Sequence, residues 1–174
     1  RLAPVRLPIR SNFRRVMLPR TKLDTRSELK QKAKTRETDN PVVEPLLEQH
    51  ERGKPTDQRV PYPIQTWSFG SDLAMVFLAG GVSVDYALRL KQDFNGSKLW
   101  IHTYANSSPG FIPSRKLLKK HDTGFPDQLS DYGQQGPFLS DIENRLIGTV
   151  QQLLPYTFYS QNKLQQYPAP RPPQ

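Results

Sequence analysis

Residues 61–114 decide the fold, and they read PYPIQTWSFGSDLAMVFLAGGVSVDYALRLKQDFNGSKLWIHTYANSSPGFIPS. Aromatic and polar residues alternate over residues 66–69, and Gly70 and Ser71 then form a turn signal. Residues 73–78 are a continuous apolar run, which is typical of a strand covered on both faces. The first half of the stretch therefore predicts an alternating segment, a turn and a buried strand.

The second half of the stretch adds a helix and another strand. A pair of glycines ends the first strand, and residues 82–94 then have the apolar spacing of a helix. After an Asn-Gly turn signal, residues 99–104 predict a strand and residues 105–113 a loop of small residues and prolines. The whole stretch predicts a strand–helix–strand unit in an α/β (α+β) fold. Its strand-end loops are where such proteins usually place binding and chemistry.

The composition limits the classes of protein that need to be considered. The 174 residues are enough for one domain, but only 35% are hydrophobic and 17 are prolines, so we expect sizeable peripheral segments. The absence of cysteine excludes disulfides, cysteine zinc sites and thiol nucleophiles. No apolar run approaches the roughly 20 residues of a transmembrane segment. The chain begins with Arg1 and shows no signal peptide, so we expect a processed protein or part of a longer one.

The net charge of +9 is concentrated near the N-terminus. Residues 1–40 hold 12 Lys or Arg against 4 Asp or Glu, whereas the rest of the chain holds 13 against 12. Repeated prolines exclude a single helix over residues 1–20 and predict a strand or an extended arm laid on another surface. Such an arm could contact nucleic acid or an anionic membrane. The scarcity of aromatic residues suited to base stacking favours packing against the rest of a larger domain.

Two helices are expected between this arm and the central unit. Thr25 and Glu28 fit a capping box for a largely solvated helix over residues 25–38. Asn40, followed by proline, predicts the start of a second helix, which Gly53 ends. The residues expected to be buried along this second helix are Val43, Leu46 and Leu47.

Beyond the central unit, a short basic turn is predicted over residues 114–120. Residues 121–136 predict a long irregular loop, and a loop of this length is more often functional or ordered by a partner than idle. The clearest helix covers residues 141–154, with a capping box formed by Ser140 and Glu143. Its expected buried face consists of Ile142, Leu146, Ile147, Val150, Leu153 and Leu154.

These segments predict four parts along the chain. Residues 1–24 form the basic extended arm, residues 25–59 a helical segment and linker, residues 60–154 the α/β core and residues 155–174 a proline-rich tail. The tail, from residue 156 onward, is expected to be extended and to be ordered only where something holds it.

Few residues are candidates for chemistry. The three histidines, which match no metal-ligand spacing, are His50, His102 and His121. A position on a strand favours a role at the core edge or in a groove for His102. Ser107 and Ser108 lack the strand-to-helix elbow that exposes a nucleophile. The glycines at 80–81 precede a helix, as in a phosphate-binding loop, but the third glycine and the Lys-Ser/Thr of a P-loop are absent, so a tight turn is favoured.

Three motifs in the central stretch are shared with a known family. Residues 62–70 match Tyr-Pro-x-Gln-x-Trp-x-Phe-Gly, residues 82–91 match Val-Val-Asp-Tyr-x-Leu-Arg-Leu-Lys, and residues 104–114 match Tyr-x-Asn-x-x-x-Gly-Tyr-Ile-Pro-Ser. On these motifs, residues 60–114 resemble the C-terminal part of the N-terminal, hydrolytic domain of neutral (non-lysosomal) ceramidases. The bacterial ceramidase-like proteins are the most similar branch, and a looser similarity extends over residues 14–154.

The resemblance implies zinc-dependent hydrolysis of the amide bond of ceramide, which yields sphingosine and a fatty acid. Two of the family's zinc ligands are upstream histidines, and two lie in the matching region as a glutamate and a tyrosine. Gly81 and Phe111 stand at these last two positions and offer no ligand atom. The resemblance thus implies a retained fold, a degenerate metal site and no zinc or other cofactor bound through this chain. Tyr104, Asn106, Ser108 and Phe111 are expected to line a groove beside that site.

On this basis we expect part of a ceramidase-like hydrolase domain of sphingolipid metabolism, a pseudoenzyme without catalytic residues. Its partner would be the rest of a larger chain or another subunit, and its ligand would be lipid-like. The protein would be periplasmic or secreted. The alternative is a basic-armed interaction or structural protein that binds RNA or an acidic partner through Arg1–Arg36. A third possibility is that a separate upstream chain completes an enzyme, and uncovered apolar strand faces would favour this version.

Overall fold

The computed structural model describes residues 4–20, 25–34, 47–48, 51–52, 59–121 and 138–166, without the side chains at 32, 33, 120, 121 and 166. These residues form five α-helices, a four-stranded sheet and a two-stranded sheet. This content confirms the predicted α+β fold class. The helix expected from Asn40 and the loop expected over residues 121–136 lie for the most part outside the described residues, as does the end of the tail.

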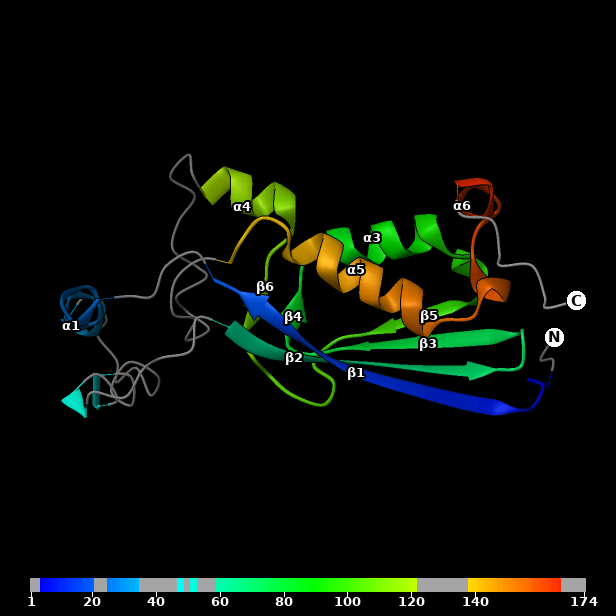
Figure 1. Ribbon diagram of the computed structural model, residues 1–174, viewed down its shortest axis with the longest axis horizontal. Coiled ribbons are helices and arrows are strands. Elements are labelled where there is room, and N and C mark those ends of the chain that lie inside the picture. The colour runs from blue at the N-terminus through cyan, green and yellow to red at the C-terminus, as the bar shows by residue number, and fades with distance from the viewer. Residues whose placement is uncertain are drawn as a thin grey trace, which may run out of the picture.

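The main sheet joins the N-terminal segment to three strands from the middle of the chain (Figure 1). Its order is β1-β2-β3-β5, with β1 at Ile9–Pro19, β2 at Arg59–Phe69, β3 at Leu73–Leu78 and β5 at Leu99–His102. β2 is antiparallel to β1 and β3, whereas β3 and β5 are parallel. Helix α3 (Val84–Asp93) connects the parallel pair, so the predicted strand–helix–strand unit is confirmed.

The basic N-terminal segment adopts the strand form, one of the two forms expected for it. β1 pairs with β2 along its whole length, from Ile9 opposite Phe69 to Pro19 opposite Arg59. The side-chain amide of Asn12 donates to the backbone oxygen of Leu153, 2.9 Å away, and so ties the strand to the helical layer. The N-terminal segment is therefore an edge strand of the main sheet.

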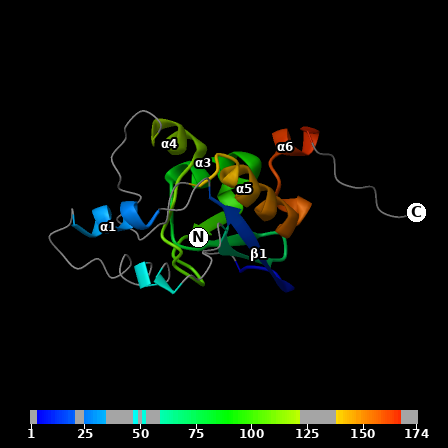
Figure 2. The same ribbon diagram turned by 60° about the vertical axis from the view of Figure 1, so that its left-hand side comes forward.

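The helices cover one face of the main sheet. Figures 1 and 2 show α3, α5 (Ile142–Leu153) and α4 (Arg115–His121) on the same side of the strands, with α1 (Arg26–Lys34) lying apart from them. The core between the layers includes Tyr62, Ile64, Val76, Leu78, Tyr86, Leu90, Leu146, Ile147 and Val150, all at most 1% exposed. Burial of this apolar surface is the main stabilising contribution to the two-layer arrangement.

The arrangement corrects the expectation that residues 73–78 are covered on both faces. Burial alternates along β3, with Ala74, Val76 and Leu78 buried and the residues between them partly exposed. The apolar run is continuous because one set of side chains meets the helices and the other forms the opposite face. A continuous apolar run cannot by itself reveal that the opposite face is open.

Two local predictions around residues 105–120 are also corrected. The end of the predicted loop is a strand, since β6 (Phe111–Ile112) pairs in parallel with β4 (Gly81–Val82). The predicted basic turn is helix α4, whose first turn is capped by Ser114, because the Ser114 hydroxyl oxygen accepts from the Leu117 amide at 3.2 Å.

One capping box is confirmed and the other is wrong. At α1 the Glu28 amide donates to the Thr25 hydroxyl oxygen at 3.3 Å, and the Thr25 amide donates to the Glu28 carboxylate at 2.6 Å. At α5 the cap residue is Asp141, which makes no side-chain capping bond. Glu143 instead bonds to groups of α3 and α4, which the local sequence could not reveal. The predicted buried face of α5 is confirmed.

The first part of the expected extended tail is folded onto the core. Residues Tyr156–Phe158 form a 3-10 turn and α6 covers Gln161–Gln166. Phe158 is 1% exposed, and its backbone oxygen accepts from the Asn95 amide at 2.8 Å. Burial of the Phe158 ring holds this segment on the core, although the sequence here has no helical pattern. Within the described ranges, no helix has the length and apolar character needed to cross a membrane.

Candidate functional site

The loops that follow β3 and β5 lie together at one edge of the main sheet. Because these strands are parallel, both loops leave the sheet on the same side. Backbone bonds join them: the Ala105 amide donates to the Leu78 oxygen at 3.1 Å and the Tyr104 amide to the Gly80 oxygen at 2.9 Å. The Gly80 amide donates in turn to the Ser107 oxygen at 3.0 Å. The predicted site residues on these loops are therefore brought to one place.

Gly80 acts as a tight-turn residue in this cluster. Its φ is +61°, a conformation that residues with a Cβ rarely adopt, and a Cβ there would lie 2.2 Å from the Gly110 oxygen. Its amide is already bonded to Ser107, so this group is not available to a phosphate. These contacts support the turn interpretation over the phosphate-loop interpretation.

The structure brings Gly81 and Phe111, the two positions to which the resemblance assigned ligands, side by side. Gly81 of β4 is the register partner of Phe111 of β6, although 29 residues separate them in the chain. A Cβ on Gly81 would lie only 2.5 Å from the Tyr104 hydroxyl oxygen. The ring of Tyr104 therefore occupies the space into which a side chain at position 81 would extend.

These residues do not fit a zinc ion. Glycine has no side chain and phenylalanine has no nitrogen, oxygen or sulfur donor, whereas a zinc ion needs three or four such donors. Among the described residues there is no group of three or more His, Cys, Asp or Glu side chains that could hold a metal ion. A zinc ligand set cannot be assembled from the described part of this loop cluster.

The other predicted groove residues are placed differently from one another. Tyr104 and Asn106 both have positive φ, +57° and +63°, and Tyr104 is 65% exposed. The Asn106 side-chain amide donates to the Gln65 side-chain oxygen of β2, 3.2 Å away. Ser108 is exposed. None of these residues lines the hollow that the described part of the chain forms between α3, α4 and α5.

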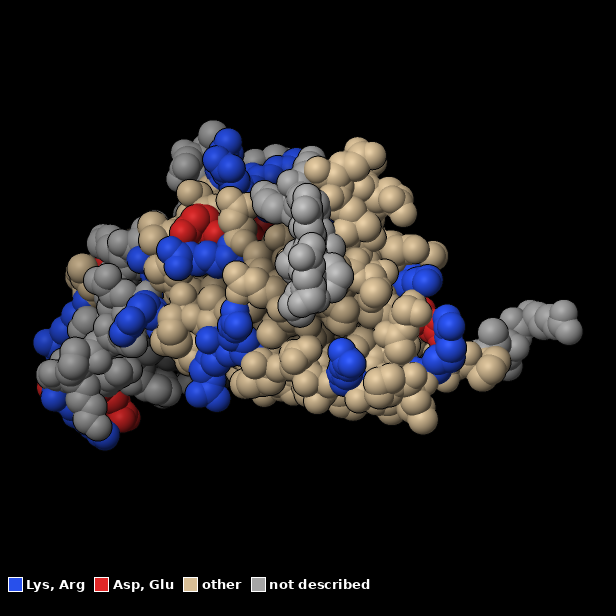
Figure 3. Space-filling view, turned by 45° about the vertical axis from the view of Figure 1, so that its right-hand side comes forward, with Lys and Arg blue, Asp and Glu red and all other residues tan. Residues whose placement is uncertain are grey.

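That hollow has a volume of about 580 Å³ and lies where α3, α4 and α5 meet. Its lining is charged and consists of Asp85, Glu143, Arg115, Lys116 and Lys119. Figure 3 shows that acidic side chains are few on one face of the molecule and lie next to lysines or arginines. The hollow therefore has both signs of charge, with the basic side chains in excess.

Both carboxylates of the hollow are bound by neighbouring groups. Asp85 accepts hydrogen bonds from the hydroxyls of Ser114 at 2.5 Å and Ser83 at 2.9 Å, and these bonds lower the pKa of Asp85. Glu143 accepts from the Arg89 guanidinium and from the Arg115 backbone amide, each at 2.8 Å. Asp85 is thus ionised at neutral pH and satisfied, which suits a structural role better than proton transfer.

His102 has the core-edge position that the sequence favoured. Its ring stacks on Phe77 with centroids 5.0 Å apart, and its Nε2 atom is buried without a hydrogen-bond partner in the structure. His50 and the side chain of His121 lie outside the described residues. The described histidine therefore belongs to an aromatic layer rather than to a metal site.

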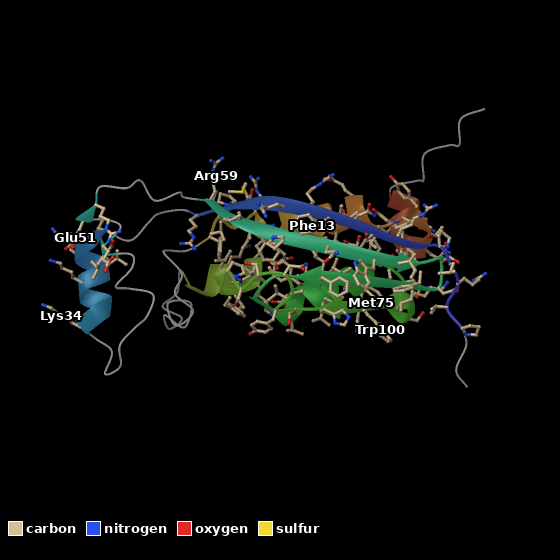
Figure 4. All side chains as sticks on the ribbon, turned by 90° about the horizontal axis from the view of Figure 1, so that it is seen from below. Phe13, Lys34, Glu51, Arg59, Met75 and Trp100 are labelled. Carbon is tan, nitrogen blue, oxygen red and sulfur yellow. The ribbon has the colours of Figure 1, made fainter. Side chains whose placement is uncertain are left out.

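That aromatic layer is part of an apolar sheet face that the sequence did not reveal. No described helix packs on this face, which Figure 4 shows from below with Phe13, Met75 and Trp100 in front of the strands. Phe13, Trp67 and Trp100 are 55%, 39% and 57% exposed. The sequence signal for this face was the alternation of apolar and polar residues in 9–17 and 59–69. Which side of the sheet these apolar residues form depends on which strands pair.

Comparisons of this chain with known proteins find no similar protein. Neither a scan of protein-family models nor searches of curated proteins and of solved structures finds a match to this chain.

Proposed function

We propose that this chain is part of a ceramidase-like hydrolase domain that has lost half of its metal site and acts by binding rather than by catalysis. The observation that carries the proposal is the pairing of Gly81 with Phe111 on adjacent parallel strands. The resemblance assigned zinc ligands to these two positions from separate motifs. Two ligands of one ion must lie close together, and these two positions do.

The contacts around the pair support a site adapted to being without metal. The Tyr104 hydroxyl lies against the backbone of Gly81, where a ligand side chain would otherwise extend. Gly80 and the loop that ends at Gly110 hold this arrangement through backbone bonds and close contact. A family scaffold of this kind can bind a lipid-like ligand or serve as a structural part of an assembly without hydrolysing an amide bond.

The partner in such an assembly is the rest of a larger chain or another subunit. The apolar sheet face supports this part of the proposal, because an exposed face with several aromatic side chains marks an interaction surface. The same open face also favours the version in which a separate upstream chain completes an enzyme. The alternative, an RNA-binding or acidic-partner-binding arm, has less support. Two arginines of the arm bind side chains of this chain instead: Arg6 pairs with Asp72 and Arg14 contacts Gln152.

Zinc content of the natural polypeptide tests the proposal. Elemental analysis, with the intact mass recorded on the same sample, is expected to find far less than one zinc per chain and no release of fatty acid from ceramide. About one zinc per chain together with amide hydrolysis would contradict the proposal.

A paired variant tests the two assigned positions directly. Gly81→Glu with Phe111→Tyr restores two oxygen donors at neighbouring register positions and is expected to raise zinc affinity by at least about tenfold. The matched control, Gly81→Gln with the natural Phe111 kept, has similar bulk without the carboxylate and phenol, and is expected to leave zinc affinity unchanged. Equal zinc affinity in both variants would show that these positions are not the ligand positions.

A further inference from the structure

The open face of the main sheet carries an aromatic side chain from each of its four strands. Polar Ser11 and Gln65 lie among them, and Asn106 of the loop after β5 donates to Gln65 at 3.2 Å, so this loop reaches the face. The register places Ser11, Trp67, Met75 and Trp100 in one row and Phe13, Gln65, Phe77 and His102 in the next. The aromatic rings contact one another within this surface, since Trp67 lies 5.4 Å and His102 5.0 Å from Phe77, measured between ring centroids. The face is therefore a preformed, close-packed layer.

Charge on this face is sparse and of one sign. The four strands contain no acidic residue. Arg15 and Arg59 are the charged residues at the odd positions of β1 and β2, which form this face, and both lie toward the end where Pro19 pairs with Arg59. Two arginines are too few for the several phosphate contacts that nucleic-acid binding needs. An apolar protein surface is the better match.

The face is large enough for a weak interface between two copies. Strands of 11, 11, 6 and 4 residues, at about 3.3 Å per residue and about 4.8 Å between strands, cover roughly 500 Å². Two such faces in contact bury about 1,000 Å² in total, without the additional area of the side chains that project from each sheet. This area lies just below the roughly 1,200–2,000 Å² of specific, stable interfaces, and it fits a dimer that dissociates on dilution.

A second copy of the chain supplies a face with the right chemistry. In a two-fold arrangement with opposed strand directions, the Arg15–Arg59 end of one copy lies over the Ile9–Phe69 end of the other, so the arginines are kept apart. Sheets that pack face to face align their strands within about 30° and interleave their side chains. The product is a helix–sheet–sheet–helix sandwich in which each sheet is covered on both faces.

We propose that this chain forms a two-fold symmetric dimer through the open face of the β1-β2-β3-β5 sheet. The dimer depends on the sheet face alone. Its failure would leave the proposed function of the Gly81–Phe111 loop cluster untouched and would leave the sheet face to the rest of a larger chain or to a different subunit. A functional metal site in the loop cluster would leave the dimer untouched.

Sedimentation velocity on the full chain at about 0.1 to 100 μM tests the proposal. We expect a shift from monomer to dimer within this range. The variant Phe13→Lys with Trp100→Lys places two charges in the interface and is expected to weaken association by at least about tenfold. Its matched control, Val84→Lys with Leu88→Lys, changes two residues of α3 that are equally exposed, 68% and 56%, and is expected to associate like the natural chain.

Intrinsic fluorescence gives a second readout that needs no variant. The chain has two tryptophans, Trp67 and Trp100, and both lie on the open face. Dilution through the dissociation range is therefore expected to shift their emission to longer wavelength and to increase quenching by acrylamide. A monomer at 100 μM with constant emission would overturn the proposal, whichever other partner covers the face, and so would equal weakening by the α3 control.

Discussion

At the scale of single residues, two neighbouring glycines have different roles. Gly80 has a positive φ, and the nearest atom to an added Cβ is a backbone oxygen that cannot move aside. Gly81 lies outside the positive-φ set, and the nearest atom to its added Cβ is the hydroxyl of the exposed Tyr104, which can rotate away. The first glycine is required by the backbone, whereas at the second a side chain is opposed only by the movable end of Tyr104.

Gly80→Ala is therefore expected to lower the free energy of unfolding by about 2–4 kcal/mol, through backbone strain and the clash with Gly110. Gly81→Ala, the matched control, is expected to cost less than about 1 kcal/mol. Urea unfolding followed by circular dichroism measures both. Equal losses at the two positions would contradict the distinct roles.

Asp72 is a second residue whose chemistry can be tested alone. The Arg6 guanidinium bonds to this carboxylate, as does the Arg6 amide at 3.0 Å, and together they lower the pKa of Asp72 from 3.8 to about 2. Because the folded pKa lies below the unfolded one, the stabilisation is complete above about pH 4 and is lost as the pH falls toward 2.

Asp72→Asn is accordingly expected to lower the melting temperature at pH 6, with a difference from the natural chain that shrinks as the pH falls from 4 toward 2. Thermal unfolding at a series of pH values measures this difference. A difference that stays constant down to the lowest pH at which the chain folds would mean that Arg6 does not act on the ionised carboxylate.

At the scale of elements, Glu143 joins three helices that the sequence describes separately. It belongs to α5, bonds to Arg89 of α3 and accepts from the first amide of α4. An acidic residue at the start of a helix satisfies unpaired amides and interacts favourably with the helix dipole. Here that residue comes from a different helix than the one it caps.

Glu143→Ala is expected to cost about 1–3 kcal/mol, because it removes the charged partner of Arg89 and leaves the first amide of α4 without its acceptor. Asn144→Ala is the control, since Asn144 accepts from the same Arg89 but is exposed and makes no bond to α4. Its expected cost is below about 0.5 kcal/mol. Chemical unfolding of both variants decides the point, and a similar small loss for each would show that Glu143 does not hold the helices together.

At the scale of the whole molecule, the N-terminal segment is part of the folded unit. Leu18 of β1 is fully buried and belongs to the same core cluster as Tyr62 and Leu146. Strand pairing over eleven residues adds backbone hydrogen bonds to this burial. The arginines of this segment are therefore side chains of an edge strand of the main sheet.

Leu18→Ala is expected to lower the global free energy of unfolding by about 2–5 kcal/mol, as large-to-small changes in a core do. Leu7→Ala, at a residue that is 77% exposed just before the strand, is expected to change it by less than about 0.5 kcal/mol. Unfolding monitored by both fluorescence and circular dichroism should give coincident transitions. Little effect of Leu18→Ala would mean that β1 is a detachable arm.

Local features were well predicted because their causes are local. The capping box at Thr25, the strand at 73–78 and the buried face of α5 follow from side chains a few residues apart, and the structure has all three. The false capping box at Ser140 shows the limit of this logic. Its glutamate had the right spacing for a local bond, but groups from α3 and α4 compete for the same carboxylate.

The α+β class, the strand–helix–strand unit and the lack of a metal-binding atom at positions 81 and 111 could be predicted without a structure, since they depend on composition and short spacings. The fold was needed to show that Gly81 and Phe111 are neighbours, because two-residue strands have no periodicity to read. It also decided that the sheet has an open apolar face. Alternation shows that a strand has two faces, but which face the helices cover depends on contacts between residues far apart in the chain.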